Sequence, residues 1–200
     1  LGLDIGGTNV KAILLDGDGA PRARARWRTA ALGEDIPTLL SSLETHIRDL
    51  LNREGLHARE LGGLGLASAG LIDSELGRIV DAPNLRHWEG APLASWLAER
   101  FPCPVALEND VNAMAYGEWR RGAGRGTRHL LCLALGTGVG GGLILDGRLY
   151  RGHRGLPAEL GHISIDRGGR RCPCGARGCV EASAGARAIE ASARRALARP

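Results

Sequence analysis

The stretch LDIGGTNVKAILLDG, residues 3–17, decides the fold because a second stretch, LALGTGVGGGLILDG at residues 133–147, repeats its pattern. Each stretch predicts an apolar strand, a glycine-rich turn, a second apolar strand and an Asp-Gly turn. A repeated supersecondary unit is a stronger indication than either glycine motif alone. The repeat therefore predicts two related α/β lobes, each of which presents one glycine turn to a shared ligand.

The rest of the chain alternates predicted strands and helices. Residues 22–28 alternate arginine with smaller or apolar residues, which predicts a third strand with a solvated arginine face in preference to a nucleic-acid patch. Residues 35–51 carry apolar residues at helical spacing and predict a core-facing helix. The further expected elements are strands at 61–70 and 102–110, and helices at 92–100, at 110–121 and from 184 onward. The expected first lobe is 1–108, and 109–200 is the first part of the second.

Composition bounds the class of protein. A hydrophobic share of 44% and a charged share of 24% are typical of a globular domain. The net charge of +4 arises from basic residues spread over nearly every predicted element, which disfavours a dedicated nucleic-acid surface. Five cysteines, no N-terminal signal and no long apolar run predict a cytoplasmic protein without membrane association. Because the chain opens without methionine and stops within a helix-like run, we expect a fragment that lacks a C-terminal part.

The two glycine turns are candidate phosphate sites. Neither matches G-x-x-x-x-G-K-[ST], and each alone is more typical of a structural hairpin. As a duplicated pair they favour phosphate binding, since glycine turns offer backbone N–H groups to anions. Thr8 and Thr137 add hydroxyl donors, Lys11 is the one lysine, and Asp4 is an oxygen ligand suited to Mg²⁺.

A candidate metal site follows the second turn. Cys172, Cys174 and Cys179 form C-x-C-x4-C, and His162 lies upstream. C-x-C is too tight for a comfortable disulfide, so a structural zinc with four protein ligands is favoured over a disulfide, a redox pair or free thiols.

Several acids stand near these motifs. Glu159 and Glu181 bracket the cysteine loop and are either solvated acids or, in the reading we favour, acceptors for sugar hydroxyls. Asp110 follows Asn109 at the end of an apolar strand. That position suits a general base and a helix N-cap equally well.

Six motifs occur in the order DIGGTNVK, PNL, ENDVNA, GTGVGGG, AELGH and CPCGARGCVEA. Together they resemble the zinc-bearing, glucokinase-like branch of the ROK family of sugar kinases and related repressors, and the resemblance covers essentially the whole chain. It implies the α/β actin-like ATPase, or ribonuclease H-like, fold, with two lobes around a cleft. It also implies a homodimer.

The resemblance further implies ATP-dependent phosphorylation of a hexose, with glucose favoured, to the sugar 6-phosphate. Asp110 is then the general base, ATP acts with Mg²⁺, and one Zn²⁺ is structural. The residues it assigns to the hexose are Gly70, Asn109, Asp110, Glu159, His162 and Glu181. Those it assigns to the ATP phosphates and Mg²⁺ are Asp4, Gly6, Gly7, Thr8, Lys11, Thr137 and Gly138. Those it assigns to zinc are His162, Cys172, Cys174 and Cys179.

Two departures from the family pattern leave alternatives open. Ala69 stands where many members carry proline, and the adenine-binding motif and returning C-terminal helix are absent from the 200 residues. A sugar-responsive transcriptional repressor is the alternative function, with nucleic acid as a partner only if a helix-turn-helix precedes Leu1. A third interpretation is an inactive fragment whose zinc loop is only structural.

Overall fold

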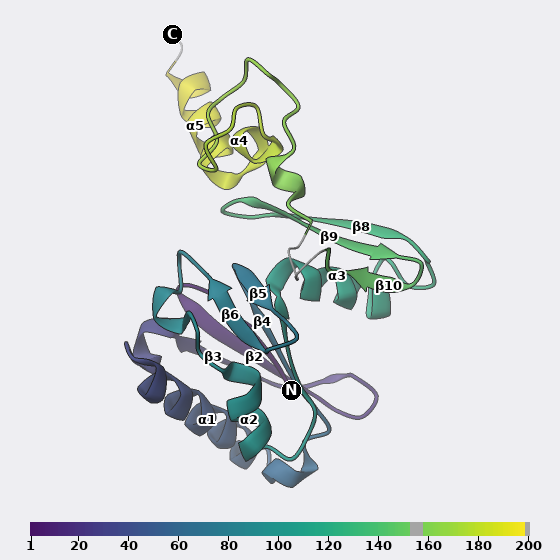
Figure 1. Cartoon of the computed structure of the whole chain (residues 1–200). Helices are drawn as coiled ribbons and strands as arrows, with labels where there is room; N and C mark the ends of the chain where they lie inside the picture. The colour runs from purple at the N-terminus through teal and green to yellow at the C-terminus, as the bar shows by residue number, and fades with distance from the viewer. Residues whose placement is uncertain (153–157, 199–200) are drawn as a thin grey trace. The chain divides into compact units, whose positions relative to one another are not determined.

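The computed structural model describes residues 1–152 and 158–198. The chain forms two compact units, Leu1–Asp110 and Val111–Pro200. They are called unit 1 and unit 2 below, and Figure 1 traces the chain through both. That they act as the two lobes of the expected fold stays a prediction. No helix in the described part of the chain combines the length and apolar character that crossing a membrane requires.

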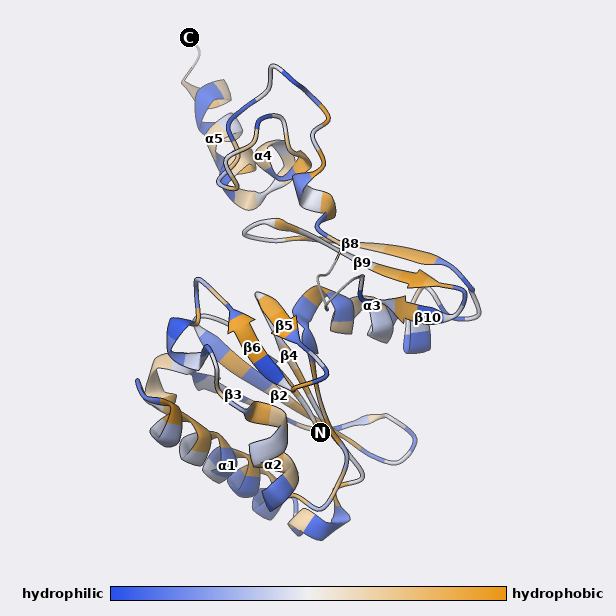
Figure 2. Ribbon diagram, viewed as in Figure 1, coloured by the Kyte–Doolittle hydropathy of each residue, from blue (hydrophilic) through white to orange (hydrophobic). Residues whose placement is uncertain are grey.

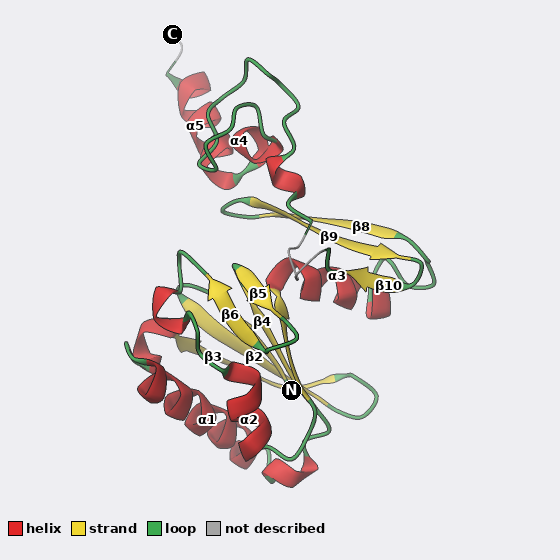
Figure 3. Ribbon diagram, viewed as in Figure 1, coloured by secondary structure: helices red, strands yellow, loops and turns green. Residues whose placement is uncertain are grey.

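Unit 1 is built on a five-stranded sheet in the order β3-β2-β1-β4-β7. Its strands are β1 (Gly2–Ile5), β2 (Asn9–Leu15), β3 (Pro21–Arg28), β4 (Leu64–Ser68) and β7 (Val105–Asn109). β1 pairs antiparallel with β2, while β1, β4 and β7 run parallel to one another. The strand predicted at 61–70 is shorter, because the chain turns at Gly70 (φ 103°). It continues into a separate hairpin of β5 (Leu71–Asp73) and β6 (Arg78–Asp81), visible as arrows in Figure 3.

Two helices and three 3-10 turns complete unit 1. They are α1 (Ile36–Arg53), α2 (Leu93–Arg100), η1 (Thr29–Leu32), η2 (Ala58–Glu60) and η3 (Arg86–Trp88). α1 confirms the helix predicted at 35–51, and it begins where the Asp35 side chain accepts a hydrogen bond from the Thr38 backbone N–H at 2.9 Å. Its apolar stripe is buried against the sheet with Leu3 and Ile5 of β1.

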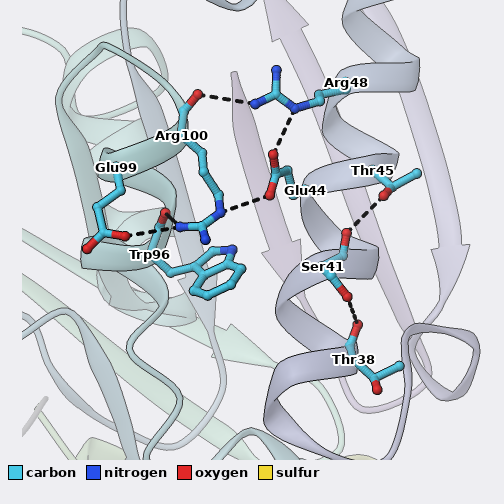
Figure 4. Close-up of polar contacts among 8 residues, drawn as sticks. All are labelled: Thr38, Ser41, Glu44, Thr45, Arg48, Trp96, Glu99 and Arg100. Carbon is cyan, nitrogen blue, oxygen red and sulfur yellow. Dashed lines mark hydrogen bonds and ion pairs between the residues drawn. The ribbon is translucent and has the colours of Figure 1, made fainter.

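Glu44 ties the two helices of unit 1 together (Figure 4). One carboxylate oxygen lies 2.9 Å from the Arg48 Nε atom, and the other lies 3.0 Å from the Arg100 Nε atom. The Arg100 guanidinium lies over the ring of Trp96. Because Glu44 and Arg48 are on α1 and Arg100 ends α2, the carboxylate fixes the spacing of the helices that back the sheet.

Unit 2 contains a three-stranded sheet in the order β10-β9-β8. Its elements are α3 (Asp110–Arg121, whose first residue closes unit 1), β8 (Leu130–Leu135), β9 (Val139–Leu145), β10 (Arg148–Tyr150), η5 (Leu160–His162), α4 (Val180–Ala184) and α5 (Ala186–Leu197). The last two correct the helix predicted from 184 onward. Helical structure already begins at Val180, and Gly185 separates α4 from α5.

The repeated stretch folds as a hairpin in both units, but the two hairpins differ by one residue. Ile5 pairs with Val10, so residues 6–9 make the first turn. Leu135 pairs with Val139, so residues 136–138 make the second. Aligning the repeat without a gap is therefore wrong for the second strand, because one residue shifts a strand's side chains to the opposite face.

The glycine run in GTGVGGG has a packing role beyond the turn. Gly140 and Gly142 lie within β9, where an added Cβ would clash with Val111 and Ala115 of α3. Gly141 faces Leu160 of η5 in the same way. Only residues 136–138 form the turn, so the later glycines let a helix and a loop lie directly on the strand.

Candidate functional site

The carboxyl ends of three parallel strands bring the functional motifs of unit 1 to one edge of its sheet. Ile5 pairs with Ser68, and Ser68 pairs with Asn109, so the last residues of β1, β4 and β7 form one row across the sheet. The glycine turn, Gly70 and Asp110 follow directly after these strands. Ligands of open α/β sheets bind at this edge.

The first glycine turn is held by η1 and by the PNL segment. The Gly6 backbone N–H donates to the Asn9 carbonyl at 3.0 Å, and the Thr29 hydroxyl donates to the Gly6 carbonyl at 2.6 Å. A Cβ at Gly7 would lie 3.1 Å from the Cβ atom of Asn84. The turn therefore lies so close to the PNL segment that a larger residue at position 7 would require Asn84 to shift by a few tenths of an ångström. A hollow of about 160 Å³ lies behind it, lined by Gly7, Thr29 and Asn84 among others.

The Asp4 and Lys11 side chains face each other across β1 and β2. The Lys11 Nζ atom lies 3.2 Å from the Asp4 Oδ2 atom, and both side chains are largely exposed. A solvated pair of this kind is worth little to stability. Both groups are thus accessible for the predicted phosphate and Mg²⁺ contacts, and either contact requires them to exchange partners.

Asn109 and Gly70, both predicted to contact a hexose, are in direct contact with each other. The buried Asn109 Nδ2 atom donates to the Gly70 carbonyl at 3.1 Å. Gly70 adopts a positive φ, and a Cβ there would clash with the Asp81 carbonyl. Ala69 stands in the position where family members often carry proline. The residue after it, Gly70, has a positive φ that does not depend on a proline at position 69. Asp110 follows as the first, half-buried residue of α3, where a helix N-terminus favours a negative charge.

The second glycine turn lies between β8 and β9 in unit 2. The Gly136 backbone N–H donates to the Gly138 carbonyl at 2.9 Å, and the Ala186 N–H donates to the Gly136 carbonyl at 3.0 Å. The turn is thus anchored to the first residue of α5. Thr137, the predicted phosphate donor, is at its tip.

The predicted zinc ligands gather in one place in unit 2. The four candidate ligand atoms of His162, Cys172, Cys174 and Cys179 all lie within 4.8 Å of one another. The Cys174 and Cys179 Sγ atoms are 3.8 Å apart, and the Cys172 Sγ and His162 Nδ1 atoms are 3.6 Å apart. A tetrahedral zinc with the usual bond lengths places two sulfurs about 3.8 Å apart and a sulfur and a nitrogen about 3.6 Å apart. The cluster therefore fits a tetrahedral zinc.

The pKa shifts of the three cysteine thiols also favour a bound cation. Burial raises the pKa of Cys172 and raises that of Cys179 to about 11, whereas a backbone hydrogen bond from Ala176 lowers that of Cys174. Three thiols this close need a cation before all can ionise. The other ring nitrogen of His162, Nε2, lies 3.7 Å from the exposed Glu159 carboxylate, an arrangement common behind metal-bound histidines.

Glu181 has a contact that sequence reasoning missed. Its Oε2 atom accepts a hydrogen bond from the Val139 backbone N–H at 3.0 Å, and its Oε1 atom lies 3.8 Å from the Cys172 sulfur. A Cβ at Gly138 would clash with the same carboxylate. The predicted sugar ligand therefore also touches the second glycine turn. No sequence signal links residues 42 positions apart, so only the fold could reveal this.

The predicted site residues thus form two groups, one in each unit. Those at the sheet edge of unit 1 are Asp4, Gly6, Gly7, Thr8, Lys11, Gly70, Asn109 and Asp110. Those around the second turn and the cluster in unit 2 are Thr137, Gly138, Glu159, His162, Cys172, Cys174, Cys179 and Glu181.

Comparison with known proteins identifies relatives of the whole chain. The ROK family profile matches residues 1–199. The glucokinase of Thermotoga maritima is 38% identical over 191 residues, which cover 94% of this chain and 58% of the glucokinase. A ROK family glucokinase from Streptomyces griseus, solved in complex with glucose and AMPPNP, is 35% identical with a TM-score of 0.76. The match covers 100% of this chain and 61% of that one.

Repressors are also among the relatives. The xylose repressor of Bacillus spizizenii is 34% identical over 189 residues, which cover 94% of this chain and 48% of the repressor. The chain therefore spans roughly half to three-fifths of the length of the curated relatives it matches.

A profile match over nearly every residue, and over a third of positions identical to a glucokinase, establish both kinship and fold. The fold is the mixed α/β actin-like ATPase fold, and the chain belongs to the ROK family.

Proposed function

We propose that the protein to which this chain belongs is an ATP-dependent hexose kinase, with glucose as the favoured substrate and the sugar 6-phosphate as product. One observation carries this proposal: the row of Ile5, Ser68 and Asn109 sets the glycine turn and Asp110 at the same edge of one sheet. A phosphate-binding turn beside a carboxylate base is the arrangement that phosphoryl transfer to a hydroxyl requires.

In this mechanism Asp110 accepts the proton of the sugar 6-hydroxyl while the hydroxyl oxygen attacks the γ-phosphorus atom of ATP. The bond between the γ-phosphorus and the bridging oxygen breaks, and ADP leaves. Asn109 and the Gly70 backbone position the sugar, and their mutual hydrogen bond presets that geometry.

The phosphates of ATP are held by the backbone N–H groups and hydroxyls of the two glycine turns. Gly7 and Thr8 supply them in unit 1, where the N–H of Gly6 closes the turn on the Asn9 carbonyl, and Thr137 and Gly138 supply them in unit 2. Lys11 neutralises phosphate charge. Asp4 would help to hold Mg²⁺, which would neutralise negative charge on the phosphates when bound.

The zinc is structural in this proposal, because four protein ligands leave no open position for a substrate. His162, Cys172, Cys174 and Cys179 hold it. Bound zinc would hold His162 of η5 to Cys179, the residue before α4, and so would fix the two segments that carry the proposed hexose ligands Glu159, His162 and Glu181.

The test is a substrate screen on the complete protein with ATP and glucose, mannose, fructose, N-acetylglucosamine or N-acetylmannosamine, read as ADP formation. Failure to consume ATP with every sugar contradicts the proposal. An Asp110→Asn variant is expected to bind sugar with unchanged affinity and to lose turnover by about 10²- to 10⁴-fold. Asp18→Asn, which removes a carboxylate from an exposed turn, is the matched control and keeps wild-type turnover.

A sugar-responsive repressor is the second candidate, favoured by the similarity to xylose repressors. The two functions separate cleanly. The complete repressor shifts an operator-length DNA duplex in a sugar-dependent way and forms no ADP, whereas the kinase forms ADP with a sugar acceptor.

A further inference from the structure

The segments before and after the metal cluster both contact Val139, the first residue of β9. Gly161 of η5 packs on Val139 so closely that a Cβ would clash with the Val139 carbonyl. Glu181 of α4 accepts a hydrogen bond from the Val139 N–H. The same residue is thus held through its carbonyl side by one segment and through its amide by the other.

The cluster joins these two segments at their nearest points. His162 directly follows Gly161, and Cys179 lies two residues before Glu181. Between these residues the segments already run side by side, since the Val180 N–H donates to the Ile163 carbonyl at 3.1 Å. A metal bound to both His162 and Cys179 therefore fixes the distance between the two residues that grip Val139.

We propose that the Cys₃His cluster and Glu181 form a clamp on the second glycine turn, residues 136–138, through Val139, the strand residue that follows it, and that Glu181 is a positioning residue for this turn. The clamp is a role beyond that of a hexose ligand. The Glu181 carboxylate occupies the space beside Gly138 that any larger residue would need, so the turn and the acid are fitted to each other. Calling the held segment a phosphate turn rests on the proposed kinase function, but the clamp itself does not.

The metal reaches the turn through this chain's own residues. The buried Val139 backbone is contacted by Gly161 and Glu181 in addition to its pairing with Leu135 of β8. Without the metal, each segment can move away from the other, and the carboxylate is released from the amide. The turn is then expected to lose order although none of its residues is a metal ligand.

Amide hydrogen exchange of residues 136–139, together with zinc content, tests the clamp without any substrate. Glu181→Ala is expected to keep one zinc per chain and to raise the exchange rate of the Val139 amide by at least about 10-fold, because a hydrogen bond to a charged acceptor is lost. Glu181→Gln keeps an acceptor oxygen of the same reach and restores most of the protection. Glu190→Ala, which removes an exposed carboxylate of α5 outside the proposed sites, is the matched control and leaves the Val139 rate unchanged.

Chelation of zinc from the wild-type protein provides a second measurement that needs no variant to fold. It is expected to raise exchange at residues 136–139 as strongly as Glu181→Ala does. Unchanged Val139 exchange in either the chelated protein or Glu181→Ala overturns the clamp. Loss of zinc from Glu181→Ala also overturns it, since the acid would then belong to the metal site.

Titration of the complete protein with ADP in the absence of sugar separates the clamp from the proposed function. If the turn binds phosphate, the Kd for ADP rises about 10-fold in Glu181→Ala, whereas an acid that only binds hexose leaves it unchanged. An unchanged Kd shows that the clamp does not affect phosphate binding by the turn. A wild-type protein that binds no ADP contradicts the kinase proposal, and the exchange result still decides the clamp.

Discussion

Removal of the metal is expected to unfold the cysteine loop while leaving unit 1 intact. The perturbation is either dialysis against a chelator or Cys174→Ser, which removes one of the four candidate ligands. The physical reason is that the loop has almost no apolar core of its own. Its buried cluster consists of Cys172, Cys179 and Ala182 alone among the described residues.

The two contributions differ greatly in size. Burial of the five side-chain heavy atoms of these residues stabilises by about 4 kcal/mol, at roughly 0.8 kcal/mol per buried carbon-sized group. Structural zinc in comparable small sites contributes about 10–16 kcal/mol. The metal therefore dominates, and its loss leaves the segment between His162 and Cys179 without enough stabilisation to stay ordered. Unit 1 has a separate core that includes Trp88 and Phe101, so it does not share this dependence.

The assay is hydrogen exchange read by mass spectrometry on zinc-loaded, chelated and variant protein. Peptides covering residues 163–180 are expected to lose protection, and peptides covering α1 are expected to keep it. Cys132→Ser removes a thiol of β8 that lies outside the cluster and serves as the matched control. The reasoning is refuted if the zinc-free protein still protects the Cys172 and Gly178 amides, whose hydrogen bonds to Ala176 and Arg170 close the loop.

Three further predictions concern unit 1. Glu44→Ala breaks the link between α1 and α2 and is expected to lower the free energy of unfolding by about 1–2 kcal/mol in urea titrations. A loss below about 0.5 kcal/mol means that these ion pairs contribute no more than solvent-exposed ones do. The Thr38 backbone N–H holds the pKa of Asp35 below its ordinary value of 3.8, so its stabilisation is complete above that pH and is lost as the pH falls through the lower folded value. Asp35→Asn keeps the cap without titrating, so its free energy of unfolding falls less than that of the wild-type protein as the pH is lowered. Identical pH profiles of the two proteins would contradict the assignment. Gly70→Ala forces a Cβ against the Asp81 carbonyl and is expected to cost about 1–3 kcal/mol in thermal unfolding and to weaken glucose binding by calorimetry; wild-type values for both would remove the need for glycine.

The elements of unit 1 were predictable because local patterns dominate there. The helical spacing of apolar residues in α1, and the cap at Asp35, are set by residues close in sequence. The strands around DIGGT follow from apolar runs bounded by turn residues. The Cys₃His cluster was equally predictable, because three of its four candidate ligands lie within eight residues, 172–179.

Other features depended on contacts between distant residues. The strand predicted at 61–70 ends early because Gly70 turns the chain. The helix α4 begins at Val180, before the helix predicted from 184 onward, and carries Glu181 in its first turn. The run of glycines after Val139 was attributed to phosphate binding as a whole. In the fold, Gly140 and Gly142 admit α3 instead, and no periodicity in the sequence announces which helix will approach a strand.

The repeated hairpin shows most clearly what each level decides. The sequence by itself determined that two strand-turn-strand units exist and that their strands are apolar, because hydrogen bonding and hydropathy act locally. Leu3 and Ile5 of β1 are 3% and 0% exposed, whereas Leu133 and Leu135 at the matching positions of β8 are 51% and 67% exposed. Figure 2 shows β8 coloured as hydrophobic along its length. Within these 200 residues, contacts between distant elements decide this difference, because in unit 1 helix α1 covers the face of the sheet that Leu3 and Ile5 occupy, and burial depends on what packs against a strand rather than on the strand itself.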